Sequence, residues 1–273
     1  LTQIARCTST DADLAVTADK KAFQAGSWAE LPPAKRKQIL LNFAQLIEDN
    51  AEELALLESL DMGKPIRFSL AVDVKHAANS LRWTAEAIDK FYGELAPTAP
   101  NQLGLISYQP VGVVACIVPW NFPLLMACWK FAPALAMGNS VILKPSEKSS
   151  LTAIRIAGLA TEAGIPAGVF NVLTGLGSEV GKALALHNQV DAIAFTGSTA
   201  TAKQLQIYAG QSNMKRVWLE AGGKSANIVF ADAPDLTKAA RAAAQAIAFN
   251  LGQVCTAGSR LLVEDAIEEE FTQ

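Results

Sequence analysis

One turn near the end of the chain combines a cysteine with the backbone freedom that a nucleophile needs. Cys255 lies in the polar stretch 249–258, with Gly252 and Gly258 on either side. Glycine has no side chain to hold a substrate away from the backbone, so these positions permit close approach to the sulfur. A thiol becomes an effective nucleophile when a base lies beside it. The turn therefore makes Cys255 a candidate for covalent catalysis.

Glu220 is the candidate base for this thiol. It is followed by Gly222 and Gly223 in the stretch 218–224, so little bulk surrounds its carboxylate. A carboxylate acts as a general base when it lies within hydrogen-bond reach of the proton that it removes. Glu220 can serve Cys255 only if the fold brings these two stretches together.

Asn121 is the candidate for stabilising negative charge on a reacting oxygen. It lies in the stretch 119–123, between Trp120 and Phe122, just ahead of an apolar helical pattern. A side-chain amide held in such a loop can donate a hydrogen bond to an oxyanion. The alternative is that Asn121 caps the helix that follows. The sequence leaves both roles open.

Three stretches could hold a nucleotide. Residues 175–181 read G-x-G-x-x-x-G, one residue longer than the dinucleotide fingerprint, and any tight turn uses glycine, so the signal is weak. Residues 195–199 offer a small, hydroxyl-rich helix start, suited either to a phosphate or to ordinary capping by Ser198 or Thr199. Lys144 and Glu147 could contact the hydroxyls of a ribose, or could form only a solvated ion pair.

Composition removes several other classes of function. The net charge of −3 argues against a nucleic-acid partner, which needs a basic face. No apolar run reaches the roughly 18 residues of a membrane span. The four cysteines show no C-x-x-C pairing, so we expect cytosolic thiols in a cytoplasmic protein and no metal site. Cys116 and Cys128 lie in apolar segments and are expected in the core. His76 and His187 are too far apart in sequence to suggest a histidine-based site.

The order of apolar patterns predicts an α/β fold. Half of the 273 residues are hydrophobic (51%), which is enough for a sizeable core. Strands alternating with helices predict a doubly wound parallel sheet, in which ligands bind at the carboxyl ends of the strands. Helices are expected over 11–25, 34–60, 68–92, 123–137, 149–163, 178–187, 199–210 and 234–249, and strands over 111–118, 140–143, 169–173, 192–195, 216–219, 226–230 and 260–264.

These elements suggest three parts. Residues 1–92 and 111–222 are predicted to form a Rossmann-like nucleotide-binding domain. Residues 93–110, rich in proline and polar side chains, are predicted to form an exposed arm whose strand edge could pair with another subunit. Residues 223–273 would begin a second α/β unit.

Taken together, the chemical motifs resemble those of the NAD(P)-dependent aldehyde dehydrogenase superfamily over essentially the whole chain. Within this superfamily, the sequence of residues 213–227, with alanine at 221, is most similar to the γ-glutamyl-γ-aminobutyraldehyde dehydrogenases of putrescine breakdown. The motifs that carry the resemblance are Glu-Ser-Leu-Asp-Met-Gly-Lys-Pro (58–65), Pro-Trp-Asn-Phe-Pro (119–123), Leu-Lys-Pro-Ser-Glu (143–147), Phe-Thr-Gly-Ser-Thr (195–199), Leu-Glu-Ala-Gly-Gly-Lys (219–224) and Gly-Gln-Val-Cys (252–255).

The resemblance implies a mechanism and a set of site residues. Cys255 would attack the aldehyde carbon, Asn121 would stabilise the oxyanion, and Glu220 would activate the water that hydrolyses the thioester. The cofactor would be NAD, with NADP possible, and the protein would be a homodimer or homotetramer. The implied cofactor site is Ile117, Pro119, Trp120, Lys144, Glu147, Gly177, Gly181, Phe195, Gly197 and Ser198, and the implied aldehyde tunnel is Phe122, Met126, Trp129 and Phe249.

Some features depart from the family pattern. Ala202 and Leu251 replace residues that are usual in their motifs, and the family's second cofactor-binding glutamate does not occur before Gln273. We therefore expect the sequence to be a fragment of a longer enzyme and to be inactive alone. The alternatives are a short, non-catalytic nucleotide-binding protein, and a cysteine hydrolase or acyltransferase that uses the same three residues.

Overall fold

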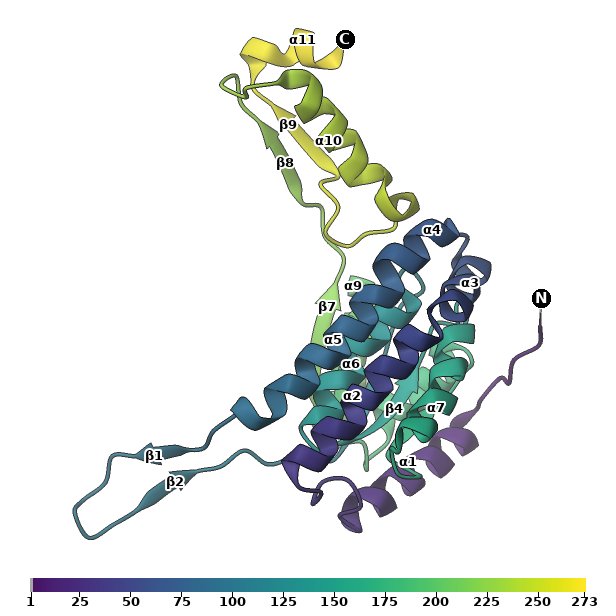
Figure 1. Cartoon of the computed structure of the whole chain (residues 1–273), viewed down its shortest axis with the longest axis vertical. Helices are drawn as coiled ribbons and strands as arrows, with labels where there is room; N and C mark the ends of the chain where they lie inside the picture. Colours follow the sequence, from purple (N-terminus) through teal and green to yellow (C-terminus); the bar gives the residue numbers. More distant parts are fainter. Residues whose placement is uncertain (1) are drawn as a thin grey trace.

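The computed structural model describes residues 2–273 and places a parallel five-stranded sheet at the centre of the molecule (Figure 1). The strand order is β5-β4-β3-β6-β7, and every neighbouring pair is parallel. The first strand of this sheet, β3, lies in its middle, β4 and β5 follow towards one edge, and β6 and β7 fill the other side. The prediction of a doubly wound sheet is therefore confirmed. The strands are β3 Val113–Ile117, β4 Ser140–Lys144, β5 Phe170–Val172, β6 Ala192–Gly197 and β7 Arg216–Ala221.

Helices cover both faces of this sheet. Alternate side chains of β3 point to opposite faces: Val114 and Cys116 pack on one side, and Val113, Ala115 and Ile117 pack on the other. The first face packs against α2 Pro33–Asp49, α3 Ala51–Met62, α5 Lys75–Ala87, α6 Pro123–Ala136 and α7 Leu151–Ala163, and the second packs against α1 Ser9–Gln24, α8 Lys182–Leu186 and α9 Thr199–Gln211.

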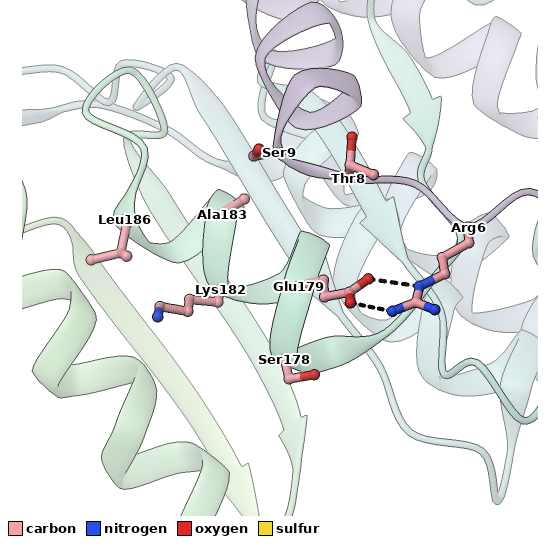
Figure 2. Close-up of a pocket in the computed structure, with 8 residues that line it drawn as sticks. All are labelled: Arg6, Thr8, Ser9, Ser178, Glu179, Lys182, Ala183 and Leu186. Atoms are coloured by element: carbon pink, nitrogen blue, oxygen red, sulfur yellow. Dashed lines mark hydrogen bonds and ion pairs between the residues drawn. The ribbon is translucent and has the colours of Figure 1, made fainter.

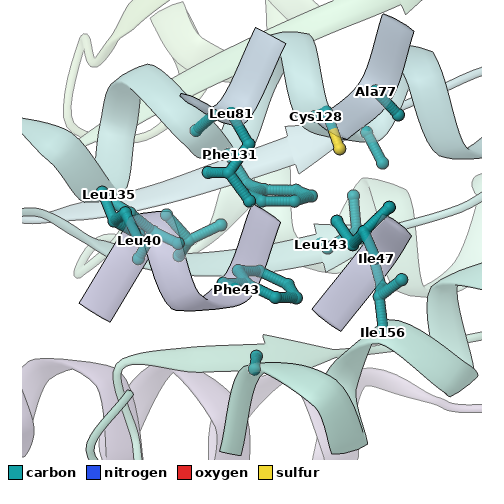
Figure 3. Packing of buried hydrophobic residues seen from close by; sticks show 14 of the residues in the cluster. Leu40, Phe43, Ile47, Ala77, Leu81, Cys128, Phe131, Leu135, Leu143 and Ile156 are labelled. Atoms are coloured by element: carbon teal, nitrogen blue, oxygen red, sulfur yellow. The ribbon is translucent and has the colours of Figure 1, made fainter. Parts of the chain in front are cut away.

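The larger core is centred on three aromatic rings. Phe43 of α2 stacks on Phe131 of α6 with ring centroids 5.7 Å apart, and Phe131 lies 5.0 Å from Phe170 of β5. Leu135 and Leu143 are also fully buried in this cluster (Figure 3). β3 and β4 are buried at every position, as expected for strands that are covered on both faces.

Two helix predictions were wrong in their extent. The expected single helix over 34–60 is two helices, because Asn50 leaves the helical region at φ −104° and ψ 23° and its side-chain amide donates to the Leu46 carbonyl. The expected helix over 68–92 begins with α4 Ile66–Phe68 and a π-helical turn, Ser69–Val74, and its helical conformation stops at Lys90. Apolar periodicity continues across both breaks, so the sequence pattern hid them.

Two parts project from this body (Figure 1). Residues 93–110 carry an antiparallel hairpin, β1 Glu94–Ala96 and β2 Gly104–Ile106, with Leu95 and Leu105 about 70% exposed. After β7, a smaller unit contains the parallel pair β8 Ala226–Val229 and β9 Arg260–Val263, together with α10 Leu236–Ala248 and α11 Glu268–Thr272. None of the residues of α10 is buried.

Truncating the central aromatic cluster should destabilise the fold. Phe131→Ala removes a fully buried ring, and substitutions of this kind typically lower the free energy of unfolding by about 3–5 kcal/mol. Phe91→Ala is the matched control, since Phe91 is 61% exposed and should change stability by less than about 1 kcal/mol. Urea unfolding of the two variants measures the difference. Equal effects would contradict the placement of this core.

Candidate active site

The carboxyl edge of the sheet gathers most of the candidate residues. Ile117 of β3 pairs with Lys144 of β4, and Thr196 of β6 pairs with Glu220 of β7. The loops that follow these four strands therefore begin at the same edge of the sheet. This follows from the parallel arrangement, which places successive strand ends side by side. Cys255 comes from outside this sheet, in the turn that follows α10.

The cysteine turn lies against the end of β7. Cys255 is half-buried, and burial raises the pKa of its thiol above the ordinary value. The Glu220 carboxylate raises this pKa further, both as a hydrogen-bond acceptor and by its charge. Cys255 and Glu220 are 35 positions apart in the chain, and the fold brings them together as a thiol–carboxylate pair.

The loop after β3 is tied directly to the cysteine turn. The Asn121 amide donates to the Gln253 carbonyl at 2.7 Å, and the Trp120 indole N–H donates to the Gln253 side-chain oxygen at 2.8 Å. In return, the Asn250 amide donates to the Asn121 carbonyl at 2.9 Å. We call these four residues, Trp120, Asn121, Asn250 and Gln253, the clasp.

The clasp leaves Asn121 with a free donor. A side-chain amide carries two N–H groups, and one of them is bound to the Gln253 carbonyl. Asn121 is not the helix cap, because Phe122 occupies that position in α6. Among the described residues, the second N–H group of this amide has no hydrogen-bond acceptor.

The backbone of the cysteine turn is held in an unusual conformation. Asn250, Leu251 and Gly252 have φ values of 52°, 58° and 77°, all in the left-handed region. Glycine adopts this region freely and asparagine tolerates it, but leucine is strained there. Such strain persists only where surrounding contacts enforce it. The Asn250 amide supplies those contacts, because it bonds both Asn121 and the Gln253 carbonyl.

The implied tunnel residues lie on two elements. Phe122 and Met126 are buried at the start of α6, whereas Trp129 and Phe249 are 52% and 41% exposed. The Phe122 and Phe249 rings are 6.2 Å apart, so α6 and the cysteine turn contribute to one apolar wall.

A cleft of about 540 Å³ lies at the same edge of the sheet, between the turn after β5 and the start of α9. Four of the implied cofactor residues line it: Ile117, Glu147, Gly177 and Gly181. The Lys144 ammonium is almost fully buried beside it, 3.4 Å from the Glu147 carboxylate, and burial lowers the pKa of Lys144. Lys144 and Glu147 therefore form an ion pair, but Lys144 is buried, so this is not the fully solvated pair offered as the alternative. The exposed side of Glu147 still faces the cleft.

Two other implied cofactor residues have structural roles that the sequence left open. Ser198 caps α9, with its hydroxyl accepting the Thr201 N–H group at 3.1 Å. Gly197 is required for packing, because a Cβ there would lie 2.4 Å from the Phe195 ring. Pro119 and Trp120 lie in the loop after β3 and do not line this cleft.

A second hollow of about 590 Å³ lies on the outer side of the turn Gly177–Gly181 (Figure 2). Arg6 and Glu179 form an ion pair across it, and that pair lowers the pKa of Glu179. Arg6 is thus already paired with a carboxylate of the same wall. Ser178 and Lys182 border both hollows.

The remaining cysteines differ sharply from Cys255. Cys116 and Cys128 are fully buried, and burial raises the pKa of Cys116 to about 12 and that of Cys128 further still. Within residues 2–273, no group of His, Cys, Asp and Glu side chains is arranged to hold a metal ion. The helices of the same range include none that is both long and apolar enough to cross a membrane.

The sequence analysis missed two sets of residues near the site. It gave no role to Asn250 and Gln253, although both stand beside Cys255. It also gave no role to Glu58, Lys64 and Asp73, which form a buried charged cluster beneath the start of α6. The motif 58–65 contains two of these three residues and was the available signal.

Comparison with known proteins gives the class. The model of the Aldehyde dehydrogenase family matches residues 1–273, and the chain belongs to this family.

Individual members of this family are similar to the chain in sequence and in fold. NADP/NAD-dependent aldehyde dehydrogenase PuuC from Escherichia coli (strain K12) is 64% identical over 271 residues, which are 99% of this chain and 55% of that protein. The crystal structure of γ-glutamyl-γ-aminobutyraldehyde dehydrogenase from Burkholderia cenocepacia J2315 matches 99% of this chain and 55% of its own, with 60% identity and a TM-score of 0.97. An NAD⁺ complex of indole-3-acetaldehyde dehydrogenase matches 100% and 55%, with 67% identity and a TM-score of 0.98. The chain thus spans about half the length of these relatives.

The contact between Cys255 and Glu220 predicts a measurable change in thiol reactivity. Glu220→Gln removes the negative charge and leaves only a weaker, neutral acceptor, so the thiol pKa should fall and the pH profile of Cys255 alkylation by iodoacetamide should move to lower pH. Mass spectrometry of the labelled chain measures this site by site. Cys116 and Cys128 should stay unmodified in the folded protein.

Glu179→Gln is the matched control, because Glu179 pairs with Arg6 on a different surface. It should leave the profile of Cys255 unchanged. A profile that moves equally in both variants would show that the effect does not come from the carboxylate beside Cys255.

Proposed function

We propose that this chain is the nucleotide-binding part, with the catalytic cysteine, of an enzyme that oxidises an aldehyde to a carboxylic acid with NAD. The observation that carries the proposal is the meeting of Cys255, Glu220 and Asn121 at the edge of the sheet that also bears the cleft. Family membership of the whole chain supports it.

In this proposal Cys255 is the nucleophile. Its thiolate adds to the aldehyde carbon and gives a thiohemiacetal, whose oxygen carries the negative charge. The free N–H group of Asn121 and the backbone N–H group of Cys255 would stabilise that oxygen. One preorganised donor of this kind is typically worth about 2.7–4 kcal/mol in the transition state. The clasp supplies the preorganisation, because it fixes Asn121 before a substrate arrives.

The residues at the cleft fit the adenosine end of a dinucleotide. Gly177 and Gly181 leave room along the turn after β5, and a Cβ at Gly177 would come within 4.0 Å of the Lys144 ammonium. Lys144 can donate to a ribose hydroxyl and Glu147 can accept from one. When NAD is bound, its nicotinamide ring accepts the hydride that leaves the thiohemiacetal carbon.

Glu147 favours NAD over NADP in this arrangement. A carboxylate facing the ribose accepts a hydrogen bond from the 2′-hydroxyl but repels a 2′-phosphate. The E. coli relative is named for both cofactors. NADP use is therefore compatible with this family pattern, at lower affinity.

Glu220 completes the reaction by serving the thioester that remains on Cys255. Its carboxylate takes a proton from water, the hydroxide oxygen attacks the thioester carbonyl, and the acid leaves as the thiolate is restored. Glu220 is exposed and lies beside the sulfur, which suits a base that must reach solvent.

We propose an amino- or γ-glutamylamino-aldehyde of polyamine breakdown as the substrate. The support comes from the relative named γ-glutamyl-γ-aminobutyraldehyde dehydrogenase, at 60% identity. The apolar wall at Phe122, Met126 and Phe249 would hold the aliphatic part of such a molecule. The exposed apolar hairpin β1–β2 would pair with a second copy of the chain in a cytoplasmic homodimer or homotetramer.

Removal of the sulfur separates binding from chemistry. In the full-length protein, a chain of the relatives' length that contains residues 1–273, Cys255→Ala should abolish aldehyde oxidation and leave the Kd for NAD unchanged within about twofold. Calorimetry and an NADH-formation assay measure the two quantities. Cys7→Ala is the matched control and should retain activity. Substantial turnover without Cys255 would overturn the assignment, and failure to bind NAD would favour a cysteine hydrolase.

Removal of the base should stop the cycle after hydride transfer. Glu220→Gln in the full-length protein should retain a rapid burst of one NADH per site while steady-state turnover falls by about 10²–10⁴-fold. Stopped-flow absorbance resolves the two phases. Loss of the burst along with the turnover would instead give Glu220 the task of activating Cys255.

A further inference from the structure

Three charged side chains are buried together beneath the start of α6. Glu58 is 0% exposed, Asp73 is 1% and Lys64 is 3%. They come from the end of α3, from the π-helical turn Ser69–Val74 and from the turn that precedes α4, and the Lys64 ammonium forms an ion pair with Asp73. Burial of charges in a core is unfavourable unless they are paired and hydrogen-bonded, so this cluster needs an explanation.

The charges of the cluster do not balance when both carboxyl groups are ionised. Two carboxyl groups face one ammonium, and one oxygen of Glu58 and one of Asp73 have no hydrogen-bond partner among the described residues. Burial and the nearby Asp73 carboxylate raise the pKa of Glu58 to about 8, whereas the Leu124 N–H group and Lys64 act to lower it. The raised pKa of Glu58 favours its protonated form at neutral pH, and a proton shared with Asp73 would satisfy both oxygens. The Cys128 thiol, from α6, also faces Glu58, which raises the pKa of that thiol.

Two contacts connect the cluster to the catalytic loop. The Glu58 carboxyl accepts the N–H group of Leu124, in the first turn of α6, at 2.6 Å. The Lys64 ammonium lies 4.1 Å from the centroid of the Phe122 ring, within the range of a favourable cation–π contact. Asn121 directly precedes Phe122. The loop is therefore held by the cluster through Phe122 and Leu124, and by the clasp through Trp120 and Asn121.

We propose that Glu58, Lys64 and Asp73 form a positioning unit that fixes the loop 119–123 and so aims the Asn121 amide at the reacting oxygen. None of the three side chains reaches the substrate. The unit acts through the Leu124 N–H group and the Phe122 ring, and its overall charge is zero. The inference rests on the proposed role of Asn121 and extends it.

A double-mutant cycle in the full-length protein tests the proposal. Glu58→Ala removes the acceptor of the Leu124 N–H group and should slow hydride transfer by about 10–100-fold, since small displacements of a catalytic group have effects of this size. The Kd for NAD should stay within about twofold. Asn121→Ala should slow the same step by about 10²–10³-fold, and the double variant should be no slower than Asn121→Ala alone. Additive effects would overturn the proposal.

Glu58→Gln is the conservative variant, because its amide keeps an acceptor for Leu124 and a donor for Asp73. It should restore hydride transfer to within about threefold of the parent at pH 7. Asp191→Ala is the stability control. Asp191 accepts the Val113 N–H group at 2.8 Å at the opposite edge of the sheet, and this variant should be less stable but equally fast. Slow hydride transfer in Asp191→Ala would show that loss of stability alone explains the Glu58→Ala result.

The shared proton gives a second readout. The raised pKa of Glu58 contributes stability that is fully present below its ordinary value of 4.5 and is lost as pH rises through about 8. Glu58→Gln has no such proton to lose, so its melting temperature should rise relative to the parent between about pH 5 and pH 8 and then run parallel. A constant difference over this range would overturn the shared proton.

The outcomes separate this inference from the proposed function. If Asn121→Ala leaves hydride transfer unchanged, the oxyanion role fails. If Asn121→Ala slows the step and Glu58→Ala does not, the oxyanion role stands and the positioning unit fails.

Discussion

The contact between the loop after β3 and the cysteine turn is the constraint on which the site depends. Cys255 does not belong to the central sheet, and the bonds of Asn121 and Asn250 across 129–132 positions of the chain hold it at the sheet's carboxyl edge. The parallel sheet brings the other groups to that edge without further contacts. The site thus has two parts. The strand order positions the residues at the strand ends, and the four side chains of the clasp position the cysteine turn.

The central sheet could be predicted because its strands are short, continuous apolar runs, as in 111–118 and 140–143, and burial on both faces requires that pattern. The helix breaks could not. Asn50 interrupts a periodic sequence whose two halves both face the same core, so the pattern reads as one helix. The π-helical turn Ser69–Val74 is hidden for the same reason.

For the site, glycine spacing and the catalytic residue types singled out Cys255, Glu220 and Asn121. Their supports were invisible, because a hydrogen bond between residues 66 or 132 positions apart leaves no local periodicity. For Ser198 and Lys144, the sequence pointed to the residue but could not decide its role. The sequence offered two roles for each residue, and the structure shows a helix cap and an ion pair that are compatible with a nearby ligand.

The left-handed run Asn250–Gly252 has a consequence for the order in which the protein assembles. Its strained backbone is enforced by partners that include residue 121, on a loop which itself needs β3 and α6 in place. One of the hydrogen bonds that support this backbone therefore forms only when the loop after β3 is in place. A chain with a misfolded sheet would therefore carry Cys255 without the hydrogen bonds that connect its turn to the loop after β3.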